Sequence, residues 1–126
     1  MQPTAPRILL VEDRGDLAAM YQLAFDMEGF ETRIANTGAA GLSVASSGWP
    51  DIVILDVQLP DIDGLAVFDA MRKRNVKVPV IFLTVQDDGA TVHRAMDGGA
   101  KDFLLKPRVK PSDVVNRIRR VLADSA

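Results

Sequence analysis

The chain has 126 residues, of which 48% are hydrophobic, so it can bury the core of one domain but leaves no room for a second catalytic or DNA-binding domain. Its formal net charge of −2 argues against direct binding of nucleic acid, for which a basic face is expected. The absence of cysteine excludes disulfides and thiolate metal sites.

The N-terminal segment, residues 1–7, lacks the apolar stretch of a signal peptide. No apolar run farther along approaches the roughly 20 residues that a membrane span needs. We therefore expect a cytoplasmic protein that has no membrane partner.

Five short strands are predicted, with a helical segment after each. The first, third and fourth are apolar throughout, which is typical of strands covered on both faces of a parallel sheet. Crossovers of this length are right-handed and give an α/β fold, a doubly wound sheet with helices on both faces. The predicted strands are Ile8–Val11, Thr32–Ala35, Ile52–Leu55, Val80–Leu83 and Phe103–Leu105.

The segments after the strands show helical patterns. Within residues 17–24 and 114–122, apolar side chains recur at intervals of three and four, which predicts two helices with one face on the sheet. Pro111 marks the start of the last helix. Three further helices, less clearly patterned, are expected near 38–47, 64–73 and 89–97.

Four of the predicted strands end on residues that can do chemistry. The carboxyl ends of parallel strands lie along one edge of a sheet, and that edge is where such sheets bind ligands. Three carboxylates, a hydroxyl and an ammonium would therefore share one pocket. These residues are Glu12 and Asp13 after the first strand, Asp56 after the third, Thr84 after the fourth and Lys106 after the fifth.

This set of side chains suits a metal ion and a phosphoryl group. Carboxylates brought this close repel one another, and a divalent cation relieves the repulsion. Hard oxygen ligands without His or Cys favour Mg²⁺, which binds through carboxylates together with phosphate oxygens. Lys106 and Thr84 would donate to the phosphoryl oxygens. Asp56 is best placed to attack phosphorus and to carry the group as an aspartyl phosphate.

Four motifs fall in order along the chain: ILLVED (8–13), PDIVILDVQLPDIDG (50–64), VPVIFLT (78–84) and GGAKDFLLKP (98–107). In these motifs the chain resembles the receiver domain of two-component response regulators, the CheY-like superfamily. The resemblance covers about residues 7–122 and implies that 1–126 is a single receiver domain. It also implies a flavodoxin-like sheet of five parallel strands in the order 2-1-3-4-5.

By this resemblance Asp56 is the phosphoacceptor, which takes the group from a sensor histidine kinase or a histidine phosphotransfer protein. Asp13, Asp56 and the backbone carbonyl of Gln58 would bind Mg²⁺ directly, and Glu12 would act through water. The chain would then be a signalling module rather than a conventional enzyme. Its conformation would control a downstream output domain or protein.

The resemblance also implies a conformational switch. Thr84 would move toward the phosphoryl group, and Phe103, the switch aromatic, would turn inward to fill the vacated space. The bond between Lys106 and Pro107 matches the position where the family carries a cis peptide, which X-Pro bonds adopt at low cost.

Two positions depart from the family pattern. Val85 stands where the family usually has a small residue, so its branched side chain would narrow access to the phosphoryl group, and slow phosphotransfer or a long-lived phosphoryl state would follow. Arg108 replaces the phenylalanine that typically follows Lys-Pro, and the loop to the last helix is one residue longer. A receiver-like module that binds proteins without phosphorylation therefore remains an alternative, and the oligomeric state, including a homodimer, remains open.

An enzyme is the third class of function. A flavodoxin needs a phosphate cradle after its first strand, where Glu12 and Asp13 would repel the anion. A hydrolase of the haloacid dehalogenase type carries Asp-x-Asp there, and this sequence does not. Two other acids, Asp61 and Asp63, are expected to be loop and helix N-terminal residues favoured by the helix dipole, not metal ligands.

Overall fold

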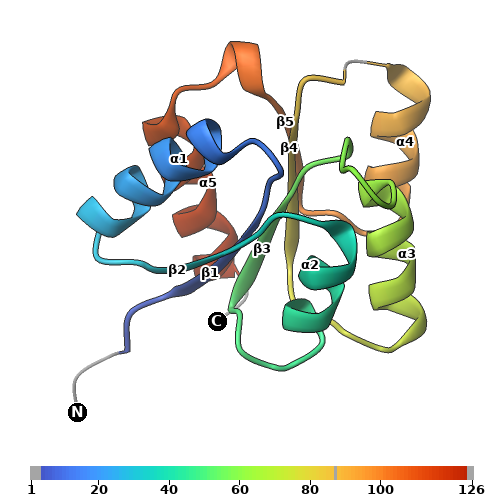
Figure 1. The fold of residues 1–126 in the computed structure, drawn as a ribbon, viewed down its shortest axis with the longest axis horizontal. Helices are drawn as coiled ribbons and strands as arrows, with labels where there is room; N and C mark the ends of the chain where they lie inside the picture. The colour runs from blue at the N-terminus through green and yellow to red at the C-terminus, as the bar shows by residue number, and fades with distance from the viewer. Residues whose placement is uncertain (1–3, 87, 125–126) are drawn as a thin grey trace.

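The computed structural model describes residues 4–86 and 88–124, which form a five-stranded parallel sheet with helices on both faces (Figure 1). The strand order is β2-β1-β3-β4-β5, which confirms the predicted doubly wound α/β fold. Each observed strand agrees with its prediction to within one residue at either end. The strands are β1 (Arg7–Val11), β2 (Glu31–Ala35), β3 (Ile52–Leu55), β4 (Val80–Thr84) and β5 (Asp102–Leu105).

Five α-helices connect or follow the strands, and they divide between the two faces of the sheet. Helices α1 and α5 cover one face, whereas α2, α3 and α4 cover the other (Figure 1). None of the helices in the described ranges is long and apolar enough to cross a membrane. The helices are α1 (Gly15–Met27), α2 (Gly38–Ala45), α3 (Gly64–Lys73), α4 (Gly89–Asp97) and α5 (Pro111–Asp124).

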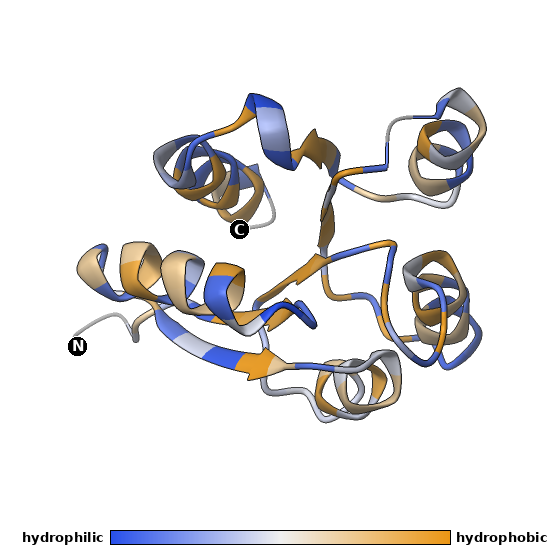
Figure 2. Cartoon of the chain, turned by 45° about the horizontal axis from the view of Figure 1, so that its top comes forward, coloured by the Kyte–Doolittle hydropathy of each residue, from blue (hydrophilic) through white to orange (hydrophobic). Residues whose placement is uncertain are grey.

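Two apolar cores lie on opposite faces of the sheet, and the central strands contribute to both. Successive side chains of a strand point to opposite faces. In β1, Ile8 and Leu10 therefore pack toward α1 and α5, while Leu9 and Val11 pack toward the other three helices. This arrangement explains why residues 8–11 of β1, all of β3 and residues 80–83 of β4 are apolar, and Figure 2 shows these strands as the apolar centre of the molecule.

The connection between β5 and α5 differs from the expectation. A short 3₁₀ helix, η1 (Lys106–Arg108), follows β5 and accommodates the longer loop. Among the described residues no peptide bond is cis, so the expectation of a cis Lys106–Pro107 bond is wrong for this structure. Pro107 lies in the first turn of η1, where its fixed φ and missing N–H are tolerated.

The junction of β3 and α3 is tightly packed around Gly64, the first residue of α3. A Cβ atom on Gly64 would lie 2.0 Å from the backbone oxygen of Asp56 and 2.8 Å from the Cα of Val57. The Gly64 N–H also donates to the Val57 carbonyl at 2.7 Å. Only a residue without a side chain lets α3 begin this close to the end of β3.

Gly64→Ala is expected to lower the free energy of unfolding by about 2 kcal/mol, because the added methyl group meets backbone that can move only if α3 moves. Urea denaturation followed by circular dichroism measures the change. Gly15→Ala is the matched control, since Gly15 also begins a helix but a Cβ there meets nothing within 4 Å. Equal stabilities for the two variants would contradict the packing argument.

Candidate functional site

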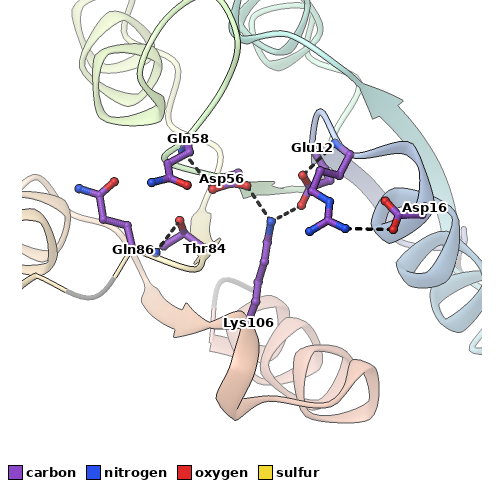
Figure 3. Close-up of polar contacts among 8 residues, drawn as sticks. Glu12, Asp16, Asp56, Gln58, Thr84, Gln86 and Lys106 are labelled. Carbon is purple, nitrogen blue, oxygen red and sulfur yellow. Dashed lines mark hydrogen bonds and ion pairs between the residues drawn. The ribbon is translucent and has the colours of Figure 1, made fainter.

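The structure brings the five residues from the strand ends together at the carboxyl edge of the sheet, and Figure 3 shows four of them, Glu12, Asp56, Thr84 and Lys106. Strands β1 and β3 are neighbours and end in register, with Val11 opposite Leu55. Glu12 and Asp56, which follow these two residues, therefore lie side by side. Thr84 ends β4, the next strand across the sheet, and Lys106 follows β5, the strand after that.

Three carboxylates form an acidic cluster at this edge. Glu12, Asp13 and Asp56 each offer an oxygen, and these atoms all lie within 4.8 Å of one another. Glu12 and Asp56 are buried, with 2% and 5% of their surface exposed, whereas Asp13 is exposed. The cluster is therefore open to solvent on the side of Asp13.

Both buried carboxylates are held in the same way, each by one backbone N–H and by Lys106. Glu12 accepts a hydrogen bond through Oε2 from the Arg14 N–H at 3.1 Å. Asp56 accepts through Oδ1 from the Gln58 N–H, also at 3.1 Å. The second oxygen of each carboxylate binds the ammonium group of Lys106.

Lys106 is the cation at the centre of the cluster (Figure 3). Its Nζ donates to Asp56 Oδ2 at 2.7 Å and also to Glu12 Oε1. Burial lowers the pKa of this ammonium, but its hydrogen bonds to Asp56 and Glu12, together with their charges, outweigh burial and raise the pKa above its ordinary value. Lys106 therefore stays charged at neutral pH, and the site has three carboxylates against one ammonium.

The surplus of negative charge makes the cluster suitable for a metal ion. Within residues 4–86 and 88–124 it is the one group of this kind that could hold a metal. All of its ligand atoms are carboxylate oxygens, the type that hard divalent cations prefer. A cation there would relieve the repulsion that Lys106 alone does not balance.

A small cavity opens beside Asp56, with a volume of about 210 Å³. Val85 is one of its walls and is 53% exposed, so it stands at the entrance rather than in the core. Two residues of the wall, Arg14 and Leu17, were missed by the sequence analysis, although both follow the first strand end closely. The cavity is lined by Asp13, Arg14, Leu17, Asp56, Gln58, Val85 and Lys106.

Thr84 is fully buried at the end of β4, and its hydroxyl accepts a hydrogen bond from the Gln86 N–H at 3.2 Å. The side chain of Gln86 in turn donates to Asp88 at 2.8 Å and to the Thr91 hydroxyl at 3.0 Å. Asp88 caps α4 by accepting from the Thr91 N–H at 2.7 Å. The hydrogen bond from Gln86, followed by that from Thr91, lowers the pKa of Asp88. Thr84 is thus linked to the start of α4.

Phe103 lies on β5 and packs toward the core between the sheet and helices α2 to α4. Its ring stacks on Phe82, with centroids 5.8 Å apart and an interplanar angle of 27°. Phe82 meets Phe68 of α3 edge to face at 5.5 Å. The aromatic side chain of β5 is therefore half-buried against an aromatic row that crosses from the sheet to α3.

The two acids of the loop between β3 and α3 contact different helices. Asp63 caps α3, because its Oδ1 accepts from the Leu65 N–H at 2.7 Å. Asp61 accepts from the N–H groups of Gly38 at 2.7 Å and Ala39 at 2.9 Å, at the start of α2. The hydrogen bonds from Ala39 and Gly38 lower the pKa of Asp61. Asp63 is thus the predicted helix N-terminal acid, and Asp61 is a loop acid that serves a distant helix.

The fold and the site together define a CheY-like α/β domain with an acidic pocket at the carboxyl edge of its sheet. The model of the response regulator receiver domain family matches residues 8–119. The chain therefore belongs to the response regulator receiver domain family, whose members act in two-component signal transduction.

Relatives of known name agree with this assignment. The chain is 37% identical over 116 residues to the transcriptional regulatory protein PcoR of Escherichia coli, a match that covers 92% of this chain and 51% of PcoR. It is 36% identical over 101 residues to the regulatory protein AtoC of Escherichia coli strain K12, covering 80% of this chain and 22% of AtoC. The chain thus spans about half of PcoR and a smaller part of AtoC.

Solved structures show the same fold. A CheY-like response regulator receiver domain protein from Methanospirillum hungatei JF-1 superposes with a TM-score of 0.89 at 25% identity, covering 95% of each chain. The predicted family and fold are therefore both confirmed.

Proposed function

We propose that Asp56 is the phosphoacceptor of this receiver domain and takes its phosphoryl group from a sensor histidine kinase or a histidine phosphotransfer protein. The supporting observation is the surroundings of Asp56. Its carboxylate is buried beside two further carboxylates and a lysine, yet it lines a cavity that Asp13 and Val85 connect to solvent. A phosphodonor can therefore reach an oxygen that is already oriented.

Mg²⁺ is the proposed cofactor. Asp13, Asp56 and the backbone carbonyl of Gln58 would hold the ion, and Glu12 would contact it through water. When bound, the ion neutralises charge that develops on the phosphoryl oxygens. The acidic cluster fits this role because its oxygen ligands and its uncompensated negative charge both favour a hard divalent cation.

The proposed transfer is a displacement at phosphorus. An oxygen of Asp56 forms the new bond, the bond from phosphorus to the donor nitrogen of the histidine breaks, and that nitrogen keeps the electron pair. In the unphosphorylated structure Lys106 donates to Asp56 and Glu12. After the transfer, the same ammonium group would donate to a phosphoryl oxygen. The N–H groups of Gln58 and Val85 are the proposed backbone donors.

The phosphorylated state is proposed to differ at Thr84 and Phe103. A Thr84 hydroxyl that turns toward the phosphoryl group gives up the hydrogen bond from the Gln86 N–H. This change reaches α4 because Gln86 also binds Asp88 and Thr91 at the start of that helix. Phe103 then turns farther inward, and a partner reads the altered surface.

The cellular setting is part of the proposal. We place the domain, with its core in residues 7–122, in the cytoplasm, where it controls an output domain or a separate output protein. Relatives such as PcoR are named as transcriptional regulatory proteins and are about twice as long as the match. DNA binding, if it belongs to the system, would then reside outside this domain, and a homodimer of receiver domains is compatible with the proposal.

The test is the intact mass of the protein after incubation with acetyl phosphate. We expect the gain of one phosphoryl group in the presence of Mg²⁺ and no gain when EDTA replaces the metal. Isothermal titration calorimetry measures Mg²⁺ binding separately. Failure of both the mass gain and Mg²⁺ binding would favour the phosphorylation-independent binding module instead.

Val85→Ala is expected to speed phosphorylation by acetyl phosphate about fivefold, which corresponds to about 1 kcal/mol of activation free energy. The reason is that Val85 stands at the wall of the cavity beside Asp56 and removal of its two methyl groups widens the entrance. The initial rate of mass gain measures the effect. Val85→Thr keeps the branched shape and should retain the wild-type rate, and three equal rates would show that Val85 is not a gate.

A further inference from the structure

The loop between β3 and α3, residues 57–63, is held at both ends by its own hydrogen bonds. At its start, the Gln58 N–H donates to Asp56 Oδ1 at 3.1 Å. At its end, Asp63 caps α3, and the Gly64 N–H donates to the Val57 carbonyl at 2.7 Å. Gln58, whose backbone the proposed function assigns to the metal and the phosphoryl group, lies in this loop.

The middle of the loop is attached to a different helix through Asp61. Its two carboxylate oxygens accept from the N–H groups of Gly38 and Ala39, at 2.7 and 2.9 Å. A carboxylate at a helix N-terminus gains from charge-assisted hydrogen bonds and from the helix dipole. The contact joins residues 22 and 23 positions apart in sequence, so it fixes one segment of the chain relative to another.

Gly38 allows this close approach. A Cβ atom at Gly38 would lie 2.4 Å from Cγ1 of Ile62, the residue after Asp61. The loop therefore rests directly on the first turn of α2, with the hydrogen bonds of Asp61 on one side of the contact and the side chain of Ile62 on the other.

Helix α2 has a cap of its own that is independent of the loop. The Thr37 hydroxyl accepts from the Ala40 N–H at 3.1 Å, and the Thr37 carbonyl accepts from the Gly41 N–H at 3.0 Å. Asp61 accepts from the N–H groups of Gly38 and Ala39, which do not bond to Thr37. The contact of Asp61 with α2 therefore holds the loop in place in addition to capping the helix.

The start of α2 is also tied to the segment that carries the acidic cluster. Residue Ala35, at the end of β2, accepts through its carbonyl from the Glu12 N–H at 3.0 Å, and α2 begins three residues later. The start of α2 is therefore fixed to the segment that holds Glu12 and Asp13. Through Asp61, the same point is fixed to the loop that holds Gln58.

We infer that Asp61 is a positioning residue of the proposed phosphorylation site: by binding the start of α2, it fixes the loop that carries the Gln58 backbone relative to the segment that carries Glu12 and Asp13. The inference rests on the proposed function, since it deepens the account of the same metal site. Asp61 itself contacts neither the metal nor the phosphoryl group.

The test compares Asp61→Ala with Thr37→Ala, since both remove a cap from α2 but only the first releases the loop. For Asp61→Ala we expect Mg²⁺ binding, measured by isothermal titration calorimetry, to weaken about tenfold, the size of effect usual for residues that orient metal ligands. The Mg²⁺ concentration for half-maximal phosphorylation by acetyl phosphate should rise by the same factor. At saturating Mg²⁺ the phosphorylation rate of Asp61→Ala should equal that of the wild type. Asp61→Asn keeps one acceptor oxygen, so its Mg²⁺ affinity should lie between that of the wild type and that of Asp61→Ala.

Thr37→Ala is expected to lower the melting temperature while leaving Mg²⁺ affinity unchanged. Asp16→Asn controls for charge, because it removes an exposed acid beside the same site without touching the loop. Wild-type Mg²⁺ affinity in Asp61→Ala, or equal loss in Thr37→Ala or Asp16→Asn, would overturn the inference. A wild-type protein that binds no Mg²⁺ would instead overturn the proposed function on which the inference rests.

Discussion

Asp56→Asn is expected to abolish phosphoryl incorporation from acetyl phosphate while the domain stays folded. An amide has nearly the size of a carboxylate but lacks the anionic oxygen that attacks phosphorus. The substitution also removes one of three mutually repelling charges, so the free energy of unfolding should not fall by much. Intact mass spectrometry reports incorporation, and circular dichroism during thermal unfolding reports the fold.

Asp51→Asn is the matched control for this result. Asp51 lies immediately before β3 and Asp56 immediately after it, but Asp51 is exposed and accepts a hydrogen bond from the Arg7 N–H at the opposite edge of the sheet. The Asp51→Asn variant should gain a phosphoryl group at the same rate as the wild type. If Asp56→Asn gained a phosphoryl group at the wild-type rate, the assignment of the phosphoacceptor would be wrong.

Lys106→Met is expected to lower the free energy of unfolding at neutral pH by about 3 kcal/mol, because removal of one partner leaves a buried charge uncompensated. Here two buried carboxylates, Glu12 and Asp56, lose the ammonium group that binds them both. Urea denaturation measures the loss. Lys101→Met, at an exposed position before β5, should change the stability far less.

The dependence of this stability loss on Mg²⁺ and on pH tests its cause. Millimolar Mg²⁺ should restore part of the stability of Lys106→Met, because an ion that binds the folded cluster favours the folded state by mass action. Since the pKa of Lys106 is raised, its contribution is complete below the ordinary lysine pKa and is lost as the pH rises through the folded-state value. The difference from wild type should therefore persist through mildly alkaline pH and narrow only above the ordinary lysine pKa. If Mg²⁺ did not change the stability difference between Lys106→Met and the wild type, the loss would come from the packing of the lysine side chain instead.

The regular elements were predictable where local pattern and burial agree. Strands β1, β3 and β4 are covered on both faces, so each reads as an unbroken apolar run with clear ends. Helix α2 ends at Ala45, two residues earlier than expected. Besides backbone N–H groups, its C-terminal carbonyls accept from side chains, since the Ser46 hydroxyl donates to the Leu42 carbonyl and the Ser47 hydroxyl to the Val44 carbonyl.

Which residues could share a site follows from the amino-acid sequence alone. Parallel strands end at a common edge, so the chemistry-bearing residues that follow each apolar run had to be placed near one another. Their order along the chain is therefore enough to predict one shared edge for Glu12, Asp13, Asp56, Thr84 and Lys106.

How those residues are held depends on the packing of the folded chain. The sequence does not show that Lys106 binds one oxygen of each buried carboxylate, that Arg14 lines the cavity, or that Asp61 serves α2 rather than α3. Strand and helix patterns depend on near neighbours, whose spacing the backbone fixes. Contacts between segments more than twenty residues apart depend instead on how whole elements pack, and no local pattern encodes that packing.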